Sequence, residues 1–208
     1  MPSKSRGSVQ RSPIFSLEDQ LAFYGSYHTN KFNRAIQVAC IWPILWTTLA
    51  LMTQLPIGKL PREVLGWLPL REQAWDLDLG VPIVLIYVIV YCVMDPFVGR
   101  LASLLVIASY VTSNLWMAYG GSAALAGGLN MVGWLALFYG NFVLEGRSPA
   151  MVNNLFRALL AAPVFVLCGV LFAFGYKPEL RRRIKARAGL KNKRFKVADK
   201  LKKKIKRK

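Results

Sequence analysis

Apolar residues gather in five long runs along the chain, and few polar positions interrupt them. The runs cover residues 35–52, 79–94, 101–118, 123–144 and 158–174. A helix needs roughly 20 residues to cross the hydrocarbon core of a membrane, and most of the runs approach that length. A helix of a soluble protein keeps a polar face, which these runs lack. The pattern therefore predicts an all-α fold, a polytopic helical membrane bundle with four to five hydrophobic segments. A soluble bundle of buried helices is the alternative.

Polar segments flank this bundle and give its predicted boundaries. Residues 1–16 form a polar N-terminal tail, residues 17–178 the helical membrane domain, and residues 179–208 a basic C-terminal tail. Ser16 is a suitable N-cap, because its hydroxyl can accept a hydrogen bond from a free amide of the first helical turn. The acid Glu18 suits the positive end of the helix dipole. The short amphipathic helix that begins there is expected to lie at the membrane interface.

Charge gives the predicted orientation. Basic residues in both tails place both ends of the chain in the cytosol, and the connection over residues 53–78, in which acids outnumber bases, on the far side. Two ends on one side require an even number of crossings, whereas the apolar runs number five. One run is therefore predicted to be re-entrant or interfacial, and the shortest, residues 79–94, is the first candidate.

The basic tail accounts for most of the net charge of +18. Between Lys177 and Lys208 there are 17 Lys and Arg residues against two acids. A helix is expected over residues 176–189, with Gly189 as its C-cap. Beyond it, the chain is either a solvated charge run that orders on contact or an amphipathic basic helix on a lipid surface.

The tail also suggests classes of partner. An anionic lipid surface is favoured, with an acidic protein second. Nucleic acid is disfavoured, because Phe195 is the only aromatic residue of this segment that could stack on a base. The cations expected to bind the anionic surface are Arg181, Arg182, Arg183, Lys202, Lys203 and Lys204.

Polar side chains inside the apolar runs are the candidate functional residues, because they are costly in a membrane. Asn130, Asn141 and Glu145 share one face of a helix over residues 123–144. Gln37 lies near the start of the first run, with Asn33 one helical turn before it. These groups either join helices by hydrogen bonds of roughly 1 kcal/mol each or form a pocket for a ligand or metal. The predicted pocket residues are His28, Gln37, Asn130, Asn141 and Glu145.

Three motifs stand out in the sequence: FYGSYHTN at residues 23–30, GWLALFYG followed by EGRSPA within residues 133–150, and FGYKPEL at residues 174–180. Together they resemble the motifs of the 2-hydroxy fatty acid dioxygenase family of endoplasmic-reticulum membrane proteins. The resemblance covers about residues 15–190. It implies a non-haem iron(II) enzyme that uses dioxygen to remove one carbon from a 2-hydroxy fatty acid, with histidines holding the iron.

The iron ligands implied by this resemblance are largely replaced. The positions where the family has histidine are occupied here by His28, Thr29, Gln37, Asn130 and Asn141. A mononuclear iron(II) oxygenase typically uses two imidazoles and a carboxylate, and this chain has a single histidine. The residual metal ligands are His28 and Glu145.

We therefore expect a non-catalytic relative without a cofactor, which acts as a structural or lipid-binding membrane subunit of a larger assembly. The alternative is an active Fe(II)-dependent dioxygenase whose site is completed by another subunit. The resemblance also implies the endoplasmic reticulum membrane. A weak dilysine retrieval pattern at Lys204 and Lys206 agrees with that compartment.

Overall fold

The structure is a computed structural model that describes residues 16–58, 77–145 and 150–205. Within this part the chain is almost entirely helical, which confirms the all-α prediction. The elements in order are α1 (Leu17–Tyr27), α2 (Lys31–Met52), β1 (Pro56–Gly58), β2 (Leu77–Asp78), α4 (Gly80–Met94), α5 (Val98–Ala118), α6 (Ala123–Tyr139), the π-helical turn η3 (Gly140–Leu144), α7 (Ala150–Ala173) and α8 (Pro178–Ile205).

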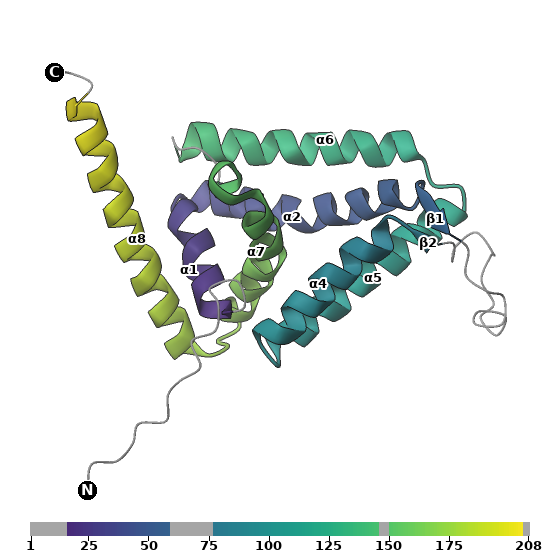
Figure 1. The fold of residues 1–208 in the computed structure, drawn as a ribbon, viewed down its shortest axis with the longest axis horizontal. Helices are drawn as coiled ribbons and strands as arrows, with labels where there is room; N and C mark the ends of the chain where they lie inside the picture. Colours follow the sequence, from purple (N-terminus) through teal and green to yellow (C-terminus); the bar gives the residue numbers. More distant parts are fainter. Residues whose placement is uncertain (1–15, 59–76, 146–149, 206–208) are drawn as a thin grey trace, which may run out of the picture.

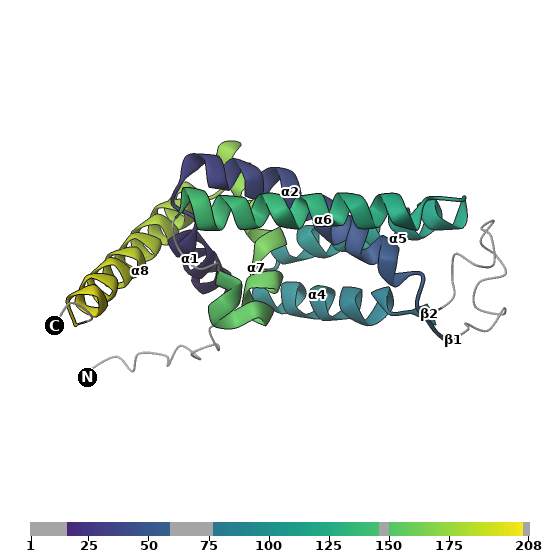
Figure 2. The same cartoon turned by 90° about the horizontal axis from the view of Figure 1, so that it is seen from above.

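The helices α2, α4, α5 and α6 form a bundle (Figures 1 and 2). The end of the bundle at which α1 and α8 lie is called its polar end. The small antiparallel β1–β2 pair lies at one end of the bundle, and α1 and α8 pack together at the other. Helices α2 and α6 are antiparallel neighbours, since Gly133 lies against Ile44 and Gly140 against Asn33. This pairing brings the start of α2 to the end of α6.

Three of the described helical segments are long and apolar enough to cross a membrane: α2, α5, and α6 continued by η3. Their outward surfaces are apolar, with Leu104, Met131 and Val132 all more than 60% exposed. A soluble protein would not leave so many large apolar side chains uncovered. The prediction of a polytopic membrane bundle is therefore confirmed.

The second and fifth apolar runs form helices that lie differently in the bundle. Helix α4, formed by the second run, packs along α5 and is about 22 Å long at 1.5 Å per residue. Helix α7, formed by the fifth run, lies across the bundle in both views (Figures 1 and 2). Of the described helices, three reach the length of a full span, while α4 and the apolar part of α7 are shorter, so the even number of crossings stays a prediction.

Local signals explain where the helices of the polar end begin. Ser16 caps α1, and its side chain accepts a hydrogen bond from the Asp19 amide, as predicted. Helix α2 begins at Lys31, four residues before the apolar run, because the Asn30 side chain accepts from the amides of Phe32 and Asn33. This early start places Asn33 on the helix rather than in a loop.

The C-terminal helix is longer than predicted. Helix α7 ends at Ala173, and Gly175, which has a positive φ of 82°, follows it, so that the Tyr176 amide bonds back to the Leu171 carbonyl in a Schellman arrangement. Helix α8 then runs from Pro178 to Ile205 without a break at Gly189. The prediction that Gly189 caps this helix is wrong. A glycine inside a helix costs only about 1 kcal/mol, which the flanking helix formers and the packing of α8 on α1 can offset.

Candidate functional site

A polar cluster lies where the α1–α2 link meets the π turn at the end of α6. We define it by seven residues: Tyr24, His28, Thr29, Asn33, Gln37, Asn141 and Glu145. Residue Gly140 makes the close approach possible, because a Cβ there would stand 2.3 Å from Asn33 Oδ1. A π turn widens the helix locally and is frequent at functional sites. Here it carries Asn141 and Glu145 to the start of α2.

Asn33 is the centre of the polar cluster and is fully buried. Its amide nitrogen lies 3.0 Å from His28 Nδ1, 3.3 Å from Asn141 Oδ1 and 3.3 Å from Glu145 Oε1. Two amide hydrogens are thus shared among three acceptors. Because the amide nitrogen can only donate, His28 Nδ1 acts as an acceptor and its ring is held in one tautomer.

The Glu145 carboxylate is surrounded by donors from the α1–α2 link. Its Oε2 accepts from the Thr29 hydroxyl at 2.8 Å, and its Oε1 accepts from the Asn30 amide at 2.6 Å. The Asn30 side chain also donates to the Leu144 carbonyl at 3.3 Å. Both carboxylate oxygens therefore accept hydrogen bonds from a segment more than 100 residues away in the sequence.

Gln37 joins the cluster to α1. The Tyr24 hydroxyl donates to Gln37 Oε1 at 2.6 Å, and Gln37 Nε2 donates to Asn33 Oδ1 at 3.4 Å. Burial raises the pKa of Tyr24 well above its usual value, so the phenol stays protonated and remains a donor. The Tyr24 ring also packs on His28, with 4.3 Å between the ring centroids.

His28 is buried and neutral at physiological pH. Burial lowers its pKa to about 4, and the negative charge of Glu145 only partly opposes this shift. A neutral imidazole can accept from Asn33, whereas a charged one cannot. The single histidine of the chain therefore acts here as a hydrogen-bonding group.

Asn130 does not join the polar cluster. Its amide nitrogen bonds to the Ile44 carbonyl at 3.1 Å and lies 2.9 Å from the hydroxyls of both Thr47 and Thr48. Eleven residues separate Asn130 from Asn141, which is roughly 16 Å along a helix axis. A shared helix face therefore does not give a shared pocket. The structure assembles His28, Thr29, Gln37, Asn141 and Glu145, and leaves Asn130 joining α6 to the middle of α2.

Two members of the network were absent from the sequence prediction. Tyr24 lies on α1 and Asn30 is the cap of α2, and nothing in their spacing marks them as neighbours of Glu145 or Gln37. Only the resemblance motif at residues 23–30, which contains both, could have indicated them.

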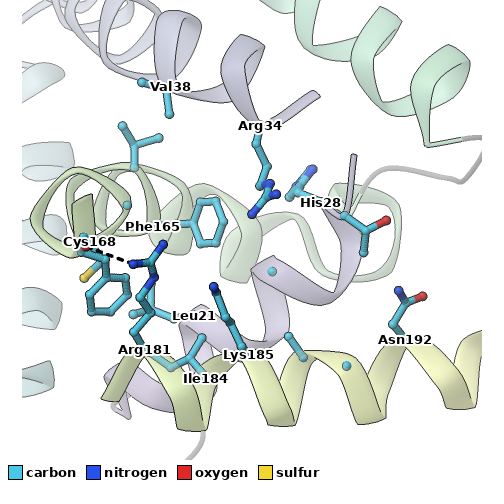
Figure 3. A pocket seen from close by; sticks show the side chains of 17 residues that line it. Leu21, His28, Arg34, Val38, Phe165, Cys168, Arg181, Ile184, Lys185 and Asn192 are labelled. Atoms are coloured by element: carbon cyan, nitrogen blue, oxygen red, sulfur yellow. Dashed lines mark hydrogen bonds between the residues drawn. The ribbon is translucent and has the colours of Figure 1, made fainter. Parts of the chain in front are cut away.

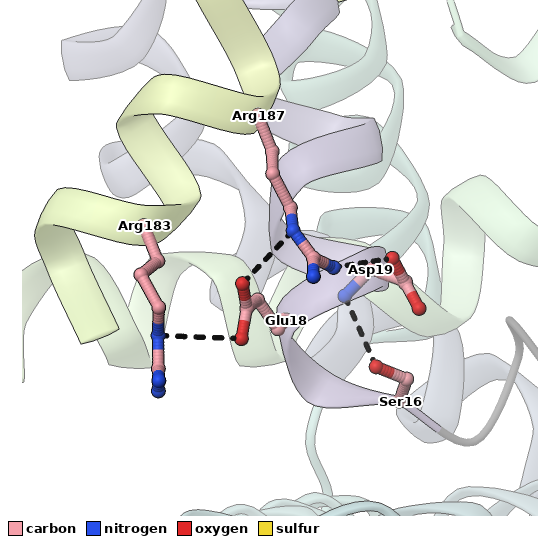
Figure 4. Close-up of polar contacts among 5 residues, drawn as sticks. All are labelled: Ser16, Glu18, Asp19, Arg183 and Arg187. Carbon is pink, nitrogen blue, oxygen red and sulfur yellow. Dashed lines mark hydrogen bonds and ion pairs between the residues drawn. The ribbon is translucent and has the colours of Figure 1, made fainter. Parts of the chain in front are cut away.

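The three consecutive arginines of the basic tail have three different surroundings. Arg183 lies 3.6 Å from Glu18 Oε2 on α1 (Figure 4), and Arg182 pairs with Glu179 on its own helix at 3.5 Å. Arg181 turns toward α7 and donates to the Phe172 carbonyl at 3.3 Å. The three arginines are thus divided between α7, their own helix and α1. The side-chain surroundings of Lys202, Lys203 and Lys204 on α8, and all of Lys206, lie outside the described residues.

Ion pairs join α8 to α1. The Arg187 guanidinium lies 3.0 Å from Glu18 Oε1 and 3.1 Å from Asp19 Oδ1 (Figure 4). Together with Arg183, this gives two cations one helical turn apart on α8 against two adjacent acids on α1. The start of the basic tail is therefore part of the folded body.

The polar cluster does not fit a mononuclear iron(II) centre. Across residues 16–58, 77–145 and 150–205, no group of three or more His, Cys, Asp or Glu residues could hold a metal ion. His28 and Glu145 are the only strong ligands in the cluster, which is fewer than the two imidazoles and a carboxylate that such a centre typically uses. The remaining polar groups are three neutral amides and the hydroxyls of Tyr24 and Thr29, which are weak ligands for iron(II) while they stay protonated.

A small cavity inside the bundle touches the polar cluster, and a larger apolar cavity continues from it. The small one, of about 40 Å³, touches His28, Gln37 and Asn141. The larger one, of about 320 Å³, lies between α2, α4, α6 and α7, and shares Trp134 and Leu137 with the small one. The polar groups therefore stand beside apolar space.

Comparison with known proteins supports the motif resemblance. A family model described as 2-hydroxy-palmitic acid dioxygenase Mpo1-like matches residues 14–174. The chain is also 25% identical over 171 residues to the 2-hydroxy-palmitic acid dioxygenase MPO1 of Saccharomyces cerevisiae, which covers 81% of this chain and 87% of the yeast protein. No solved structure matches the chain.

Proposed function

The chain belongs to the 2-hydroxy-palmitic acid dioxygenase Mpo1-like family, and from this premise we propose that it is a non-catalytic member. The hydrogen bonds of its polar cluster hold the α1–α2 link against the end of α6. The protein would then serve as a structural or lipid-binding subunit in a membrane, without an iron cofactor.

One observation carries this proposal: the polar cluster contains one imidazole and one carboxylate, and both belong to a hydrogen-bonded network of otherwise neutral groups. Both oxygens of Glu145 accept hydrogen bonds from the α1–α2 link, and His28 Nδ1 accepts from Asn33. Positions where the resemblance expects imidazoles hold an amide and a hydroxyl that complete the same network, Gln37 and Thr29. Buried polar groups satisfied in this way specify one packing of the surrounding helices.

The lipid-binding part of the proposal is supported by the apolar cavity of about 320 Å³ beside the cluster. Its wall includes Ile41, Tyr87 and Trp134, and its volume is in the range of small-molecule sites. An acyl chain would fit such a lining. The chemistry of iron would not be needed to hold it.

We place the protein in the endoplasmic reticulum membrane with both tails in the cytosol. The position of α1 and α8 at the same end of the bundle supports a common side for the two tails (Figure 1). The excess of Lys and Arg in both tails supports the cytosolic side.

The first test is the iron content of protein purified anaerobically in detergent, measured by ICP-MS with the yeast relative prepared in parallel. We expect no iron above background in this chain, and no chain-shortened product by mass spectrometry after incubation with ferrous iron, oxygen and 2-hydroxypalmitate. Stoichiometric iron that is lost in His28→Ala, together with turnover, would overturn the proposal and favour an active dioxygenase.

A second test restores imidazoles to the cluster. The triple variant Thr29→His, Gln37→His, Asn141→His should gain iron binding, because it returns nitrogen ligands to positions around His28 and Glu145. The matched control is Asn130→His, which adds an imidazole roughly 16 Å away along the helix axis and should bind none. Equal iron in both variants would show that the cluster is not where the ligands were lost.

A further inference from the structure

A cavity of about 500 Å³ lies between α1, α2, α7 and α8 (Figure 3). His28 and Thr29 of the polar cluster form part of its wall, but most of its lining comes from residues outside that cluster. It is formed by the docking of α8 on α1, since Ile184 and Ala188 of α8 form part of its wall. Because α8 continues past Gly189, Asn192 also lines this side of the cavity.

Three cations line the cavity. Arg34 from the first turn of α2 and Lys185 from α8 point into it, and Arg181 stands one helical turn before Lys185 (Figure 3). Arg181 is held by its hydrogen bond to the Phe172 carbonyl. Among the described residues, no carboxylate lines the cavity, and neither Arg34 nor Lys185 forms an ion pair. Positive charge is thus gathered here without a counter-ion.

The rest of the wall is largely apolar. Val38 on α2 and Phe165, Gly169 and Phe172 on α7 supply this surface. The side chain of Val38 is 48% exposed, on the part of α2 that continues into the apolar run. The cavity therefore has a cationic part beside an apolar wall that continues along two helices.

The three cations and the apolar wall lie at different levels along the bundle. Arg34 directly precedes the apolar run of α2, and Arg181 and Lys185 follow closely after α7. All three cations therefore lie at the polar end, where a membrane helix would meet lipid headgroups. Basic pockets at this level between helices are typical sites for anionic lipid headgroups.

We propose that this cavity binds the phosphomonoester headgroup of an anionic phospholipid, with an acyl chain against the α2–α7 wall. Three cations exceed the single charge of a carboxylate, whereas a phosphate monoester carries up to two negative charges and three acceptor oxygens. Arginine matches phosphate oxygens with paired donors. This inference does not rest on the proposed lack of catalysis, and an iron-binding result would leave it unchanged.

The ion pairs between α8 and α1 position the site. Glu18 forms ion pairs with Arg183 and Arg187, which therefore face α1 (Figure 4). Arg181 and Lys185, each two residues before one of these arginines, line the cavity instead (Figure 3). Cations of α8 are thus divided between a structural contact and a binding site.

Native mass spectrometry of the intact chain in detergent, titrated with dipalmitoyl phosphatidic acid, tests the proposal. We expect one specific adduct with phosphatidic acid and none with phosphatidylcholine. The double variant Arg181→Gln, Lys185→Gln should bind about tenfold more weakly, because each cation contributes charge-assisted hydrogen bonds. The matched control is Arg182→Gln, an adjacent arginine that pairs only on its own helix with Glu179, and its binding should be unchanged. Binding weakened as much in Arg182→Gln as in the double variant would overturn the proposal, since net charge alone would then explain binding.

A second pair of variants leaves the charge unchanged. A Cβ at Gly169 meets no atom within 4 Å, and neither does one at Gly128 on α6, so both glycines accept a larger side chain. Gly169→Leu fills the apolar wall of the cavity and should abolish the phosphatidic acid adduct, whereas Gly128→Leu, outside the cavity, should keep it. An adduct retained in Gly169→Leu would overturn the site.

Competition identifies the source of the anion. Inorganic phosphate should displace the lipid only weakly, because it lacks an acyl chain, and palmitate should also compete weakly, because it lacks the second charge. Displacement by palmitate as effective as by phosphatidic acid would overturn the phosphate assignment and identify a carboxylate site. Displacement by inorganic phosphate as effective as by the lipid would overturn the acyl part.

Discussion

Asn130 and Asn141 are the same residue type on one continuous helical segment, yet their surroundings differ. Asn130 sits in the middle of the α2–α6 pair and bonds only to a carbonyl and two hydroxyls of α2. Asn141 sits on the π turn, where it accepts from Asn33 in a network that also holds a histidine and a carboxylate. One position joins two helices, and the other belongs to a cluster that closes the end of the bundle.

The comparison shows that a polar residue in a membrane segment gains its role from the backbone that presents it. A regular α-helix directs Asn130 at its antiparallel neighbour, and such bonds stabilise helix pairs modestly. The π turn shifts the backbone so that Gly140 touches Asn33 and the following residues reach the α1–α2 link. The same amide therefore becomes part of a site-like cluster.

The largest effect is expected for Gly140→Val. Its Cβ would stand 2.3 Å from Asn33 Oδ1, so the substitution both overpacks the contact and breaks the hydrogen bonds of Asn33. We expect a loss of about 3 kcal/mol in stability, visible as a lower thermal midpoint in detergent micelles. Gly127→Ala on the same helix meets open space and should not lower the midpoint. An unchanged midpoint in Gly140→Val would contradict the close approach.

Acid should weaken the polar cluster through His28. Its pKa is near 4 in the folded chain and near 6.5 when unfolded, so the unfolded state takes up the proton first as the pH falls. The stability contributed by the neutral ring is complete above about pH 6.5 and is lost progressively down to about pH 4, by up to about 3 kcal/mol. Thermal melts across this window should show it, and His28→Gln should remove that part of the pH dependence. The chain has no other histidine to confuse the assignment.

Asn33→Ala sharpens the comparison from the side of α2. It removes the donor shared by His28, Asn141 and Glu145 and leaves these groups with fewer partners, at a cost of about 2 kcal/mol. Hydrogen exchange of the α1–α2 link should rise, while α5 stays protected. Unchanged exchange in the link would show that the network does not hold it.

Asn130→Ala should give the smallest effect. It removes bonds within a single helix pair, which average about 0.6 kcal/mol in membrane bundles. The pH profile should match that of the unaltered chain, since His28 lies in the other region. An effect as large as that of Asn33→Ala would remove the distinction between the two regions.

The sequence by itself determined the helical membrane class. Apolar runs free of charge, the Ser16 cap and the family motifs all depend on local pattern, and the helices follow them closely. Much of the polar cluster was also predictable, because His28, Gln37, Asn141 and Glu145 stand out as polar groups at the edges of apolar runs. Helical periodicity reports which residues share a face, and this information is local.

Only the tertiary structure decided which of these residues meet. Periodicity placed Asn130 and Asn141 together, whereas the antiparallel pairing of α2 and α6 set them opposite different parts of α2. The crossing of α7, the continuation of α8 past Gly189 and the division of three adjacent arginines among three surroundings likewise depend on contacts between distant segments. The hydrophobic effect is non-directional, so a hydrophobic pattern predicts that a helix face is buried but not which segment covers it. The covering segment is selected by close packing at positions such as Gly140 and by hydrogen bonds between segments far apart in the sequence.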